Sequence, residues 1–181
     1  MSIAVIYGGT RPNGNAEILT DKAIQGIEVE KFYLKDFNVQ PIVDQRHTAE
    51  GFKDINDDYN SIIERVLQHD IFIFSTPIYW YSMSGTMKLF IDRWSQTLRD
   101  SKFPQFKTSM SSKKAFVIAV GGDEPYIKGL PMIQQFQYIF DFMGISFEGY
   151  LLGEGNKPGD VLNDTTALFA ASQLQKKLTH V

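Results

Sequence analysis

The sequence predicts a doubly wound α/β fold of three layers, in which a five-stranded parallel sheet lies between two layers of helices. Short apolar runs alternate with segments of helical spacing along the chain, a pattern typical of successive strand–helix–strand units. Three runs, at residues 3–7, 71–74 and 114–120, are apolar without alternation, which indicates strands buried on both faces. We expect these strands at the centre of the sheet, and the strand order 2-1-3-4-5 places them there.

The first half of the chain supplies three strands and two helices. Gly8 and Gly9 end the first strand, and a polar stretch without a clear period after the second strand is expected to be a long loop. The expected elements are a strand at 3–7, a helix at 16–24, a strand at 29–34, a loop at 35–54, a helix at 59–67 and a strand at 71–74.

The second half continues the alternation. Helical spacing resumes at Met87 and ends near Trp94. Pro131 suits the start of a helix and Gly144 suits the position just after a helix end, so a helix is expected between them. The other expected elements are a polar connection at 103–112, a strand at 114–120, a strand at 146–152, a glycine-rich loop at 153–159 and a last helix at 160–177.

The composition favours one folded domain over residues 1–181. Hydrophobic residues make up 43% of the chain and charged residues 22%, close to ordinary globular usage. The net charge of −3, with Lys and Arg scattered, lacks the basic patch of a nucleic-acid-binding protein. No apolar run approaches the ~20 residues of a membrane span, and the amino terminus lacks the pattern of a signal peptide. We therefore expect a cytoplasmic protein without a membrane span or a nucleic-acid partner.

The sequence offers few residues for metal binding or nucleophilic chemistry. It contains no cysteine, which excludes disulfides, thiol nucleophiles, iron–sulfur clusters and cysteine-ligated zinc. Its three histidines, His47, His69 and His180, lie in different segments, so neither a metal site nor a Ser-His-Asp triad is predicted.

A glycine loop follows the first strand. Residues 9–15 read Gly-Thr-Arg-Pro-Asn-Gly-Asn and lead into a helix, so their backbone N–H groups and the helix N-terminus predict a phosphate site. Gly9 and Gly14 have the spacing of a nucleoside triphosphate loop, but Asn15 and Ala16 stand where that loop has Lys and Ser or Thr. A single terminal phosphate fits better. The structural alternative is a glycine turn that simply leads into a helix.

An aromatic stretch follows the third strand. Residues 76–85 read Thr-Pro-Ile-Tyr-Trp-Tyr-Ser-Met-Ser-Gly. Consecutive residues of an extended segment point to opposite sides, so Tyr79, Trp80 and Tyr81 cannot all enter one core. They are expected to display an apolar surface at the carboxyl end of a central strand, where ligands bind in open α/β sheets.

The two loops are expected to face each other across one crevice, because the first and third strands are neighbours in the predicted order. Phosphate donors on one side and aromatic rings on the other suit a flat aromatic ring with a monophosphate tail, and FMN has that shape. Gly121, Gly122 and Asp123 follow the fourth strand and would complete the crevice, with the glycines allowing the backbone to approach the ring.

Two blocks of the sequence resemble the NAD(P)H-dependent FMN reductase family of the flavodoxin-like superfamily. Residues 8–16 resemble its G-S-x-R-x-x-G-N-T phosphate loop, and residues 76–93 resemble its T-P-I-Y-W-x-x-x-S…K-x-F-I-D-R block. The resemblance implies a single flavodoxin-like FMN-binding domain with these cofactor contacts: Gly9, Thr10, Arg11, Asn13, Gly14, Asn15, Ala16, Pro77, Ile78, Tyr79, Trp80, Gly121 and Gly122.

The resemblance also implies an activity. A bacterial FMN-containing oxidoreductase of this kind would pass hydride from NADH or NADPH through FMN to a small acceptor such as a quinone, a nitro or azo compound, or free flavin. No catalytic side chain is expected, because the flavin carries the redox chemistry. The family resemblance further implies a homodimer or homotetramer.

The sequence departs from the family pattern at two positions of the phosphate loop. Gly9 and Ala16 replace a serine and a threonine, which removes two hydroxyl donors, and Thr10 is expected to compensate for one. A charge-assisted hydrogen bond is worth ~1.5–3 kcal/mol, so weaker phosphate binding is expected. Residues 41–45 also lack the cysteines that many relatives carry, which we interpret as excluding resemblance to the iron–sulfur branch.

Two alternative functions fit the same fold. One is a flavodoxin, an electron-transfer protein with no substrate of its own, for which a net charge of −3 is mild. The other is a regulatory or interaction protein that keeps the fold without using flavin, an alternative left open by the two missing hydroxyls.

Overall fold

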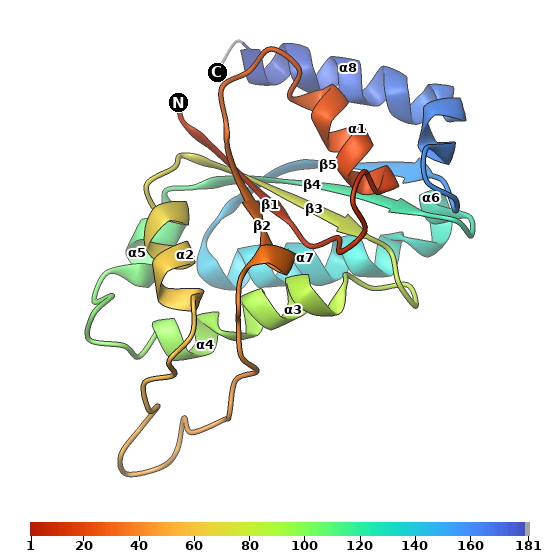
Figure 1. Ribbon diagram of the computed structural model, residues 1–181. Helices are drawn as coiled ribbons and strands as arrows, with labels where there is room; N and C mark the ends of the chain where they lie inside the picture. The colour runs from red at the N-terminus through yellow and green to blue at the C-terminus, as the bar shows by residue number, and fades with distance from the viewer. Residues whose placement is uncertain (180–181) are drawn as a thin grey trace.

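The computed structural model describes residues 1–179 and contains one sheet of five parallel strands in the order β2-β1-β3-β4-β5 (Figure 1). The predicted flavodoxin-like order is therefore confirmed. The strands are β1 (Ile3–Tyr7), β2 (Glu30–Tyr33), β3 (Ile71–Pro77), β4 (Lys114–Gly121) and β5 (Ser146–Glu154).

The helices include all five that the sequence predicts and three short ones that it does not. They are α1 (Asn15–Ala23), α2 (Tyr59–Val66), α3 (Gly85–Asp92), α4 (Trp94–Thr97), α5 (Phe106–Ser111), α6 (Pro125–Lys128), α7 (Leu130–Met143) and α8 (Thr165–Thr179), with 3₁₀ turns at Leu34–Asp36 and Asp160–Asn163. The connection at 103–112, expected to be irregular, forms α5 because Phe106 and Met110 lie one turn apart and are buried.

The helices cover both faces of the sheet. Helices α1 and α8 lie on one face, whereas α2, α3, α4, α5 and α7 lie on the other (Figure 1). Alternate residues of β1 belong to the two cores: Val5 and Tyr7 pack toward α1 and α8, while Ala4 and Ile6 pack toward the other layer. The unbroken burial of β1 explains why its sequence is apolar without alternation.

The carboxyl ends of the central strands meet at one edge. Tyr7 of β1 pairs with Ser75 of β3, and the Gly8 amide donates to the Ser75 carbonyl oxygen at 2.8 Å. The Ile78 amide likewise donates to the Val120 carbonyl oxygen at 2.8 Å. The loops after β1, β3 and β4 therefore start side by side.

A buried ion pair anchors the long loop between β2 and α2. The Arg93 guanidinium, whose side chain is 1% exposed, contacts the Asp57 carboxylate and donates to the Gln40 carbonyl oxygen at 3.1 Å. Its carbon lies 4.4 Å from the centre of the Tyr59 ring. Arg93 thus ties residues 37–58 to the junction of α3 and α4.

Within residues 1–179, no helix is long and apolar enough to cross a membrane, and His, Asp and Glu form no cluster of three suited to a metal ion. His69 contacts the Glu30 carboxylate at 2.6 Å. His180 lies outside the described residues.

Candidate FMN-binding site

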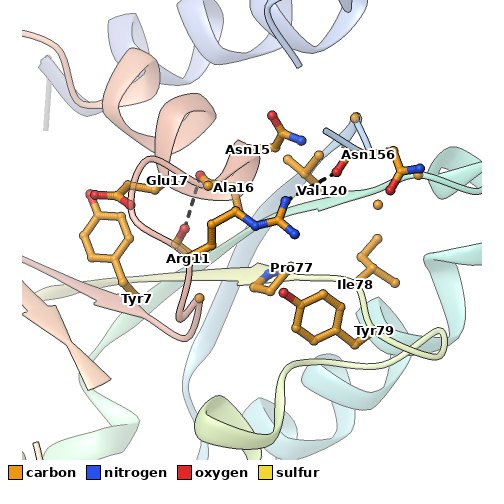
Figure 2. Close-up of a pocket in the computed structure, with 16 residues that line it drawn as sticks. Tyr7, Arg11, Asn15, Ala16, Glu17, Pro77, Ile78, Tyr79, Val120 and Asn156 are labelled. Atoms are coloured by element: carbon orange, nitrogen blue, oxygen red, sulfur yellow. Dashed lines mark hydrogen bonds between the residues drawn. The ribbon is translucent and has the colours of Figure 1, made fainter. Parts of the chain in front are cut away.

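A crevice of about 180 Å³ opens at the carboxyl ends of β1, β3 and β4 (Figure 2). Loops from four parts of the chain form its walls. The residues that line it are Tyr7, Gly9, Arg11, Gly14, Asn15, Ala16, Glu17, Ser75, Pro77, Ile78, Tyr79, Val120, Gly121, Gly122, Gly155 and Asn156.

One wall is the loop after β1 and the first turn of α1. Gly14 precedes this helix in extended conformation, and no side chain caps the helix. The first intrahelical bond is donated by Ile18, so the N–H groups of Asn15, Ala16 and Glu17 have no acceptor within the described part of the chain. These donors, together with the positive end of the helix dipole, suit a phosphate.

Arg11 lies across the crevice. Its guanidinium donates to the Asn156 carbonyl oxygen at 3.4 Å, and Figure 2 shows the side chain extending from the β1 loop toward the loop after β5. The Glu17 carboxylate lies beside the Tyr7 ring, away from Asn156 (Figure 2). Arg11 is therefore placed to contribute positive charge at the centre of the site.

Tyr7 contributes a neutral wall. Its ring stacks on Tyr33 at 4.6 Å, and its hydroxyl donates to Asp21 at 3.1 Å. Burial raises the pKa of Tyr7 well above its ordinary value, and the Asp21 carboxylate raises this pKa further. Tyr7 therefore stays protonated and carries no charge toward a bound phosphate.

The side chain of Asn15 does not face the crevice as a free donor. Its Nδ2 donates to the Lys157 carbonyl oxygen at 2.8 Å, and its Oδ1 accepts from the Gly159 amide at 2.9 Å. Asn15 therefore holds the loop after β5 against the start of α1, and its backbone N–H remains for a ligand.

The aromatic stretch forms a tight turn. Tyr79 and Ser82 exchange two backbone hydrogen bonds of 3.0 Å, and Trp80 and Tyr81 between them have φ values of 48° and 62°. The expectation that this segment is extended is wrong at Trp80 and Tyr81. The turn geometry, with two left-handed residues, is what projects both rings outward, and the Trp80 side chain is 94% exposed.

A second cavity of about 150 Å³ adjoins the first, because Ile78, Gly121 and Gly122 line both. Trp80 and Tyr81 lie on its rim, and the Tyr81 hydroxyl donates to Asp123 at 2.9 Å. Lys128 also contacts Asp123, at 2.6 Å. The Lys128 ammonium and then the Tyr81 hydroxyl hold the pKa of Asp123 below its ordinary value. Asp123 therefore fixes the aromatic turn to the loop after β4.

The two glycines after β4 permit close side-chain packing. A Cβ at Gly121 would lie 3.1 Å from the Ile78 Cβ, and one at Gly122 would lie 3.0 Å from the Asn156 Cβ. Contact with a ring edge was the expected reason for these glycines. The structure adds a reason within the protein, since they let Ile78 and Asn156 form the floor and far wall.

Ten of the thirteen contacts expected from the sequence line the crevice. Thr10 and Asn13 do not line it, and Trp80 lines the neighbouring cavity instead. Six lining residues were not predicted as contacts: Tyr7, Glu17, Ser75, Val120, Gly155 and Asn156. Gly155 and Asn156 lie in the expected glycine-rich loop at 153–159, and its position after the last strand was the signal that could have found them.

Comparison with known proteins gives a family match. Residues 1–135 match the family model described as NADPH-dependent FMN reductase. The chain is 64% identical over 177 residues to YwqN of Bacillus subtilis (strain 168), provisionally named an NAD(P)H-dependent FMN-containing oxidoreductase, with 98% of each chain covered.

Two further similarities matter. A solved structure of a Trp repressor binding protein from Bacillus subtilis is 59% identical, with a TM-score of 0.82 and coverage of 96% of this chain and 97% of that one. An iron–sulfur flavoprotein of Methanocaldococcus jannaschii is 29% identical, covering 100% of this chain and 97% of the relative. The expected lack of resemblance to the iron–sulfur branch is therefore wrong, although this chain has no cysteine to hold a cluster.

Proposed function

The chain belongs to the NADPH-dependent FMN reductase family and is an NAD(P)H-dependent FMN oxidoreductase, and we propose that its FMN binds in the crevice between residues 9–16 and 77–79. The observation that carries this proposal is the pairing of β1 with β3, which puts free backbone donors and an aromatic edge on opposite walls of one cavity.

The donor set suits the phosphate of FMN. Backbone N–H groups at the start of α1 lack protein acceptors, and the crevice has no side-chain hydroxyl donor at Gly9 or Ala16. A Cβ at Gly14 would lie 3.3 Å from the Arg11 carbonyl oxygen, so the loop is folded tightly around its own backbone. We infer a phosphate cup made of amides, with Arg11 as its counter-charge.

The other walls suit the flavin ring. Pro77, Ile78 and Tyr79 offer apolar surface on one side, and the backbone of Gly121 and Gly122 lies on another. Tyr79 is 48% exposed, which leaves room for a second flat ring beside it. Bound FMN supplies the hydride acceptor and donor chemistry, and these residues position the ring and leave one face open.

We propose that Tyr79, Trp80 and Tyr81 shape the slot for the incoming nicotinamide and then for the acceptor. The acceptors are flat molecules such as a quinone, a nitro or azo compound, or free flavin, which match the exposed aromatic turn. Residues in strained backbone conformations often mark functional sites, and Trp80 combines such a conformation with an exposed ring.

We also propose that the chain, as one FMN-binding domain, acts in the cytoplasm as a homodimer or homotetramer. A groove of about 390 Å³ between α3, α4 and α7 is mostly apolar, and Tyr138 and Phe142 on its rim are each 63% exposed. Apolar patches of this kind are typical of interfaces. Light scattering of the purified protein measures the oligomeric state directly, and a monomer at all concentrations would contradict this proposal.

The test of the function is FMN content combined with steady-state turnover. We expect the purified protein to be yellow or to bind added FMN, and to oxidise NADH or NADPH continuously when a quinone is present. FMN binding without turnover would indicate a flavodoxin. A colourless protein that does not bind added FMN would indicate a regulatory protein. The name of the similar Bacillus subtilis structure, a Trp repressor binding protein, is the reason to keep this alternative.

A further inference from the structure

Two hydroxyl groups at the start of α3 converge on one backbone oxygen of the β1 loop. The Ser84 Oγ donates to the Gly8 carbonyl oxygen at 2.7 Å, and the Thr86 Oγ1 donates to the same oxygen at 2.7 Å. Ser84 is buried, and neither residue lines the crevice. A carbonyl with both lone pairs occupied is held in a fixed direction.

The Gly8 carbonyl and the Gly9 N–H belong to the same peptide unit. No peptide bond in residues 1–179 is cis, so the carbonyl and the N–H point in opposite directions. The hydroxyls pull the Gly8 oxygen toward α3, which turns the Gly9 N–H away from α3. Gly9 lines the crevice, and its N–H has no acceptor among the described residues.

The absence of a side chain at Gly8 makes this contact possible. A Cβ there would lie 2.7 Å from the Ser84 Oγ and 2.8 Å from the Met87 Cβ. The start of α3 can therefore approach the β1 loop only at a glycine. This contact joins the two sequence blocks of the site, the phosphate loop and the segment after β3.

We propose that Ser84 and Thr86 are positioning residues that aim the Gly9 amide at the phosphate of FMN. This inference rests on the proposed function. It gives the hydroxyls of the second block an indirect role: they act on the ligand through the peptide between Gly8 and Gly9. It also explains how a loop with glycine at position 9 can still present a directed donor.

A substitution at Thr86 distinguishes the positioning of the Gly9 amide from the capping of α3. Ser84 is the N-cap of α3 and also accepts a hydrogen bond from the Met87 amide at 3.2 Å, so its loss would weaken the helix as well. Thr86 has no capping bond, and Thr86→Val keeps the side-chain shape while removing the donor. Thr166→Val is the matched control, because Thr166 lies exposed in the first turn of α8.

The first measurement compares FMN with riboflavin, which lacks the phosphate. We expect Thr86→Val to weaken FMN binding about tenfold, the loss of about one hydrogen bond, and to leave riboflavin binding unchanged. Ser84→Ala/Thr86→Val should weaken FMN binding further. Thr166→Val should bind FMN like the unaltered chain. Equal FMN affinity of Thr86→Val and the unaltered chain overturns the inference and leaves the proposed function standing.

The second measurement uses inorganic phosphate and the Gly9 amide resonance in a ¹H–¹⁵N spectrum. We expect phosphate to shift this resonance in the unaltered chain and to shift it less in Thr86→Val. Such a result in a protein that does not bind FMN would show that the hydroxyls direct the Gly9 amide toward a phosphate, and it would refute the proposed function. An unshifted Gly9 resonance, or an equal shift in both proteins, overturns the inference.

Discussion

At the scale of single residues, the site depends on backbone groups whose directions are set by side chains outside the crevice. Asn15 uses its amide group to hold the loop after β5, through bonds to Lys157 and Gly159. The Gly8 carbonyl is similarly held by hydroxyls of α3. A phosphate at the loop after β1 would therefore meet mostly backbone N–H groups, which suit an anion because they are donors at the positive end of the helix dipole.

Gly14→Val tests whether the backbone N–H groups of the loop after β1 bind the phosphate. Gly14 has a φ of −66°, which valine adopts easily, but a Cβ would lie 3.3 Å from the Arg11 carbonyl oxygen and 3.8 Å from the Arg11 Cβ, so the larger side chain would displace the loop that carries Arg11. We expect FMN affinity to fall at least tenfold, because charge-assisted bonds of ~1.5–3 kcal/mol each are lost. Fluorescence titration measures this affinity. Gly85→Val is the control, since a Cβ at Gly85 meets no atom within 4 Å. Unchanged FMN binding by Gly14→Val would contradict the assignment of residues 9–16 to the phosphate.

The residue types of the phosphate loop could be predicted from the sequence, but their roles could not. Glycines before a helix indicate an anion site whatever their neighbours do. That Asn15 faces the loop after β5, or that Asn156 reaches Gly122, depends on contacts between residues more than thirty positions apart. Such contacts leave no local pattern in one sequence.

At the scale of elements, the tight turn at residues 79–82 distinguishes this site. Its two central positions have the left-handed backbone that usually calls for Asn-Gly, yet they hold Trp80 and Tyr81. The turn is held by backbone bonds to Ser82 and by the Tyr81–Asp123 contact. A β-branch or aromatic ring in this conformation costs about 1–2 kcal/mol, which the fold tolerates at this edge.

Trp80→Asn tests whether this strain serves substrate binding. Asparagine tolerates the left-handed conformation, and the Trp80 side chain is 94% exposed, so we expect the free energy of unfolding to stay the same or rise by up to about 1 kcal/mol. The KM for NAD(P)H should rise about two- to tenfold, because a stacking contact of ~0.5–1.5 kcal/mol is lost. Urea unfolding and steady-state kinetics measure the two effects. A large loss of stability would show instead that Trp80 supports the fold.

Asp164 joins three elements near the site. Its carboxylate accepts from the Ala167 amide at 2.9 Å, the Glu154 amide at 2.8 Å and the Tyr126 hydroxyl at 2.6 Å. Partial burial acts to raise its pKa, but these hydrogen bonds outweigh burial and hold the pKa below its ordinary value.

Asp164→Asn should therefore cost about 1 kcal/mol of unfolding free energy at pH 7, because hydrogen bonds to an ionised carboxylate are stronger than those to a neutral amide and one amide oxygen cannot serve all three donors. A lowered folded-state pKa gives stability that is complete above the unfolded carboxylate's pKa and is lost as the pH falls through the folded value. The difference between the two proteins should thus shrink on acidification, as urea unfolding at pH 7 and pH 3 will measure. Asp36→Asn, at an exposed position, is the control. A difference that is the same at both pH values would refute this account.

At the scale of the whole molecule, the buried pair of Arg93 and Asp57 holds the long loop to the helical layer. Both side chains are 1% exposed, and Arg93 also donates to Gln96 at 3.0 Å. Residues 76–93, the second block that resembles the family, therefore contribute crevice residues at their start and the buried ion pair that holds the long loop at their end.

Arg93→Met should destabilise the protein by about 3–5 kcal/mol, because it leaves the Asp57 carboxylate buried and unpaired. Arg93→Met/Asp57→Asn should recover part of this loss. Urea unfolding measures both, and proteolysis should cut residues 41–56 faster in the single variant. A loss below about 1 kcal/mol would show that the pair does not anchor the loop.

The central position of β1, β3 and β4 could be predicted from the sequence because central parallel strands are apolar on both faces. Their order could not be derived from this pattern alone and was expected from the flavodoxin-like fold, which places these three strands in the middle. The start of α8 was placed five residues too early, at 160 instead of Thr165, because the 3₁₀ turn at Asp160–Asn163 has helix-like spacing and only the Asp164 cap marks the true start. The sequence does not predict α4, α5 and α6 because each spans fewer than two turns, too short to show a helical period.

A crystal structure of the protein with FMN tests the central claim most directly. We predict the phosphate within hydrogen-bonding distance of the amides of Gly9 and Ala16, and the flavin ring between Tyr79 and the backbone of Gly121. FMN bound with its phosphate outside residues 9–16, or in the groove between α3 and α7, would contradict the account.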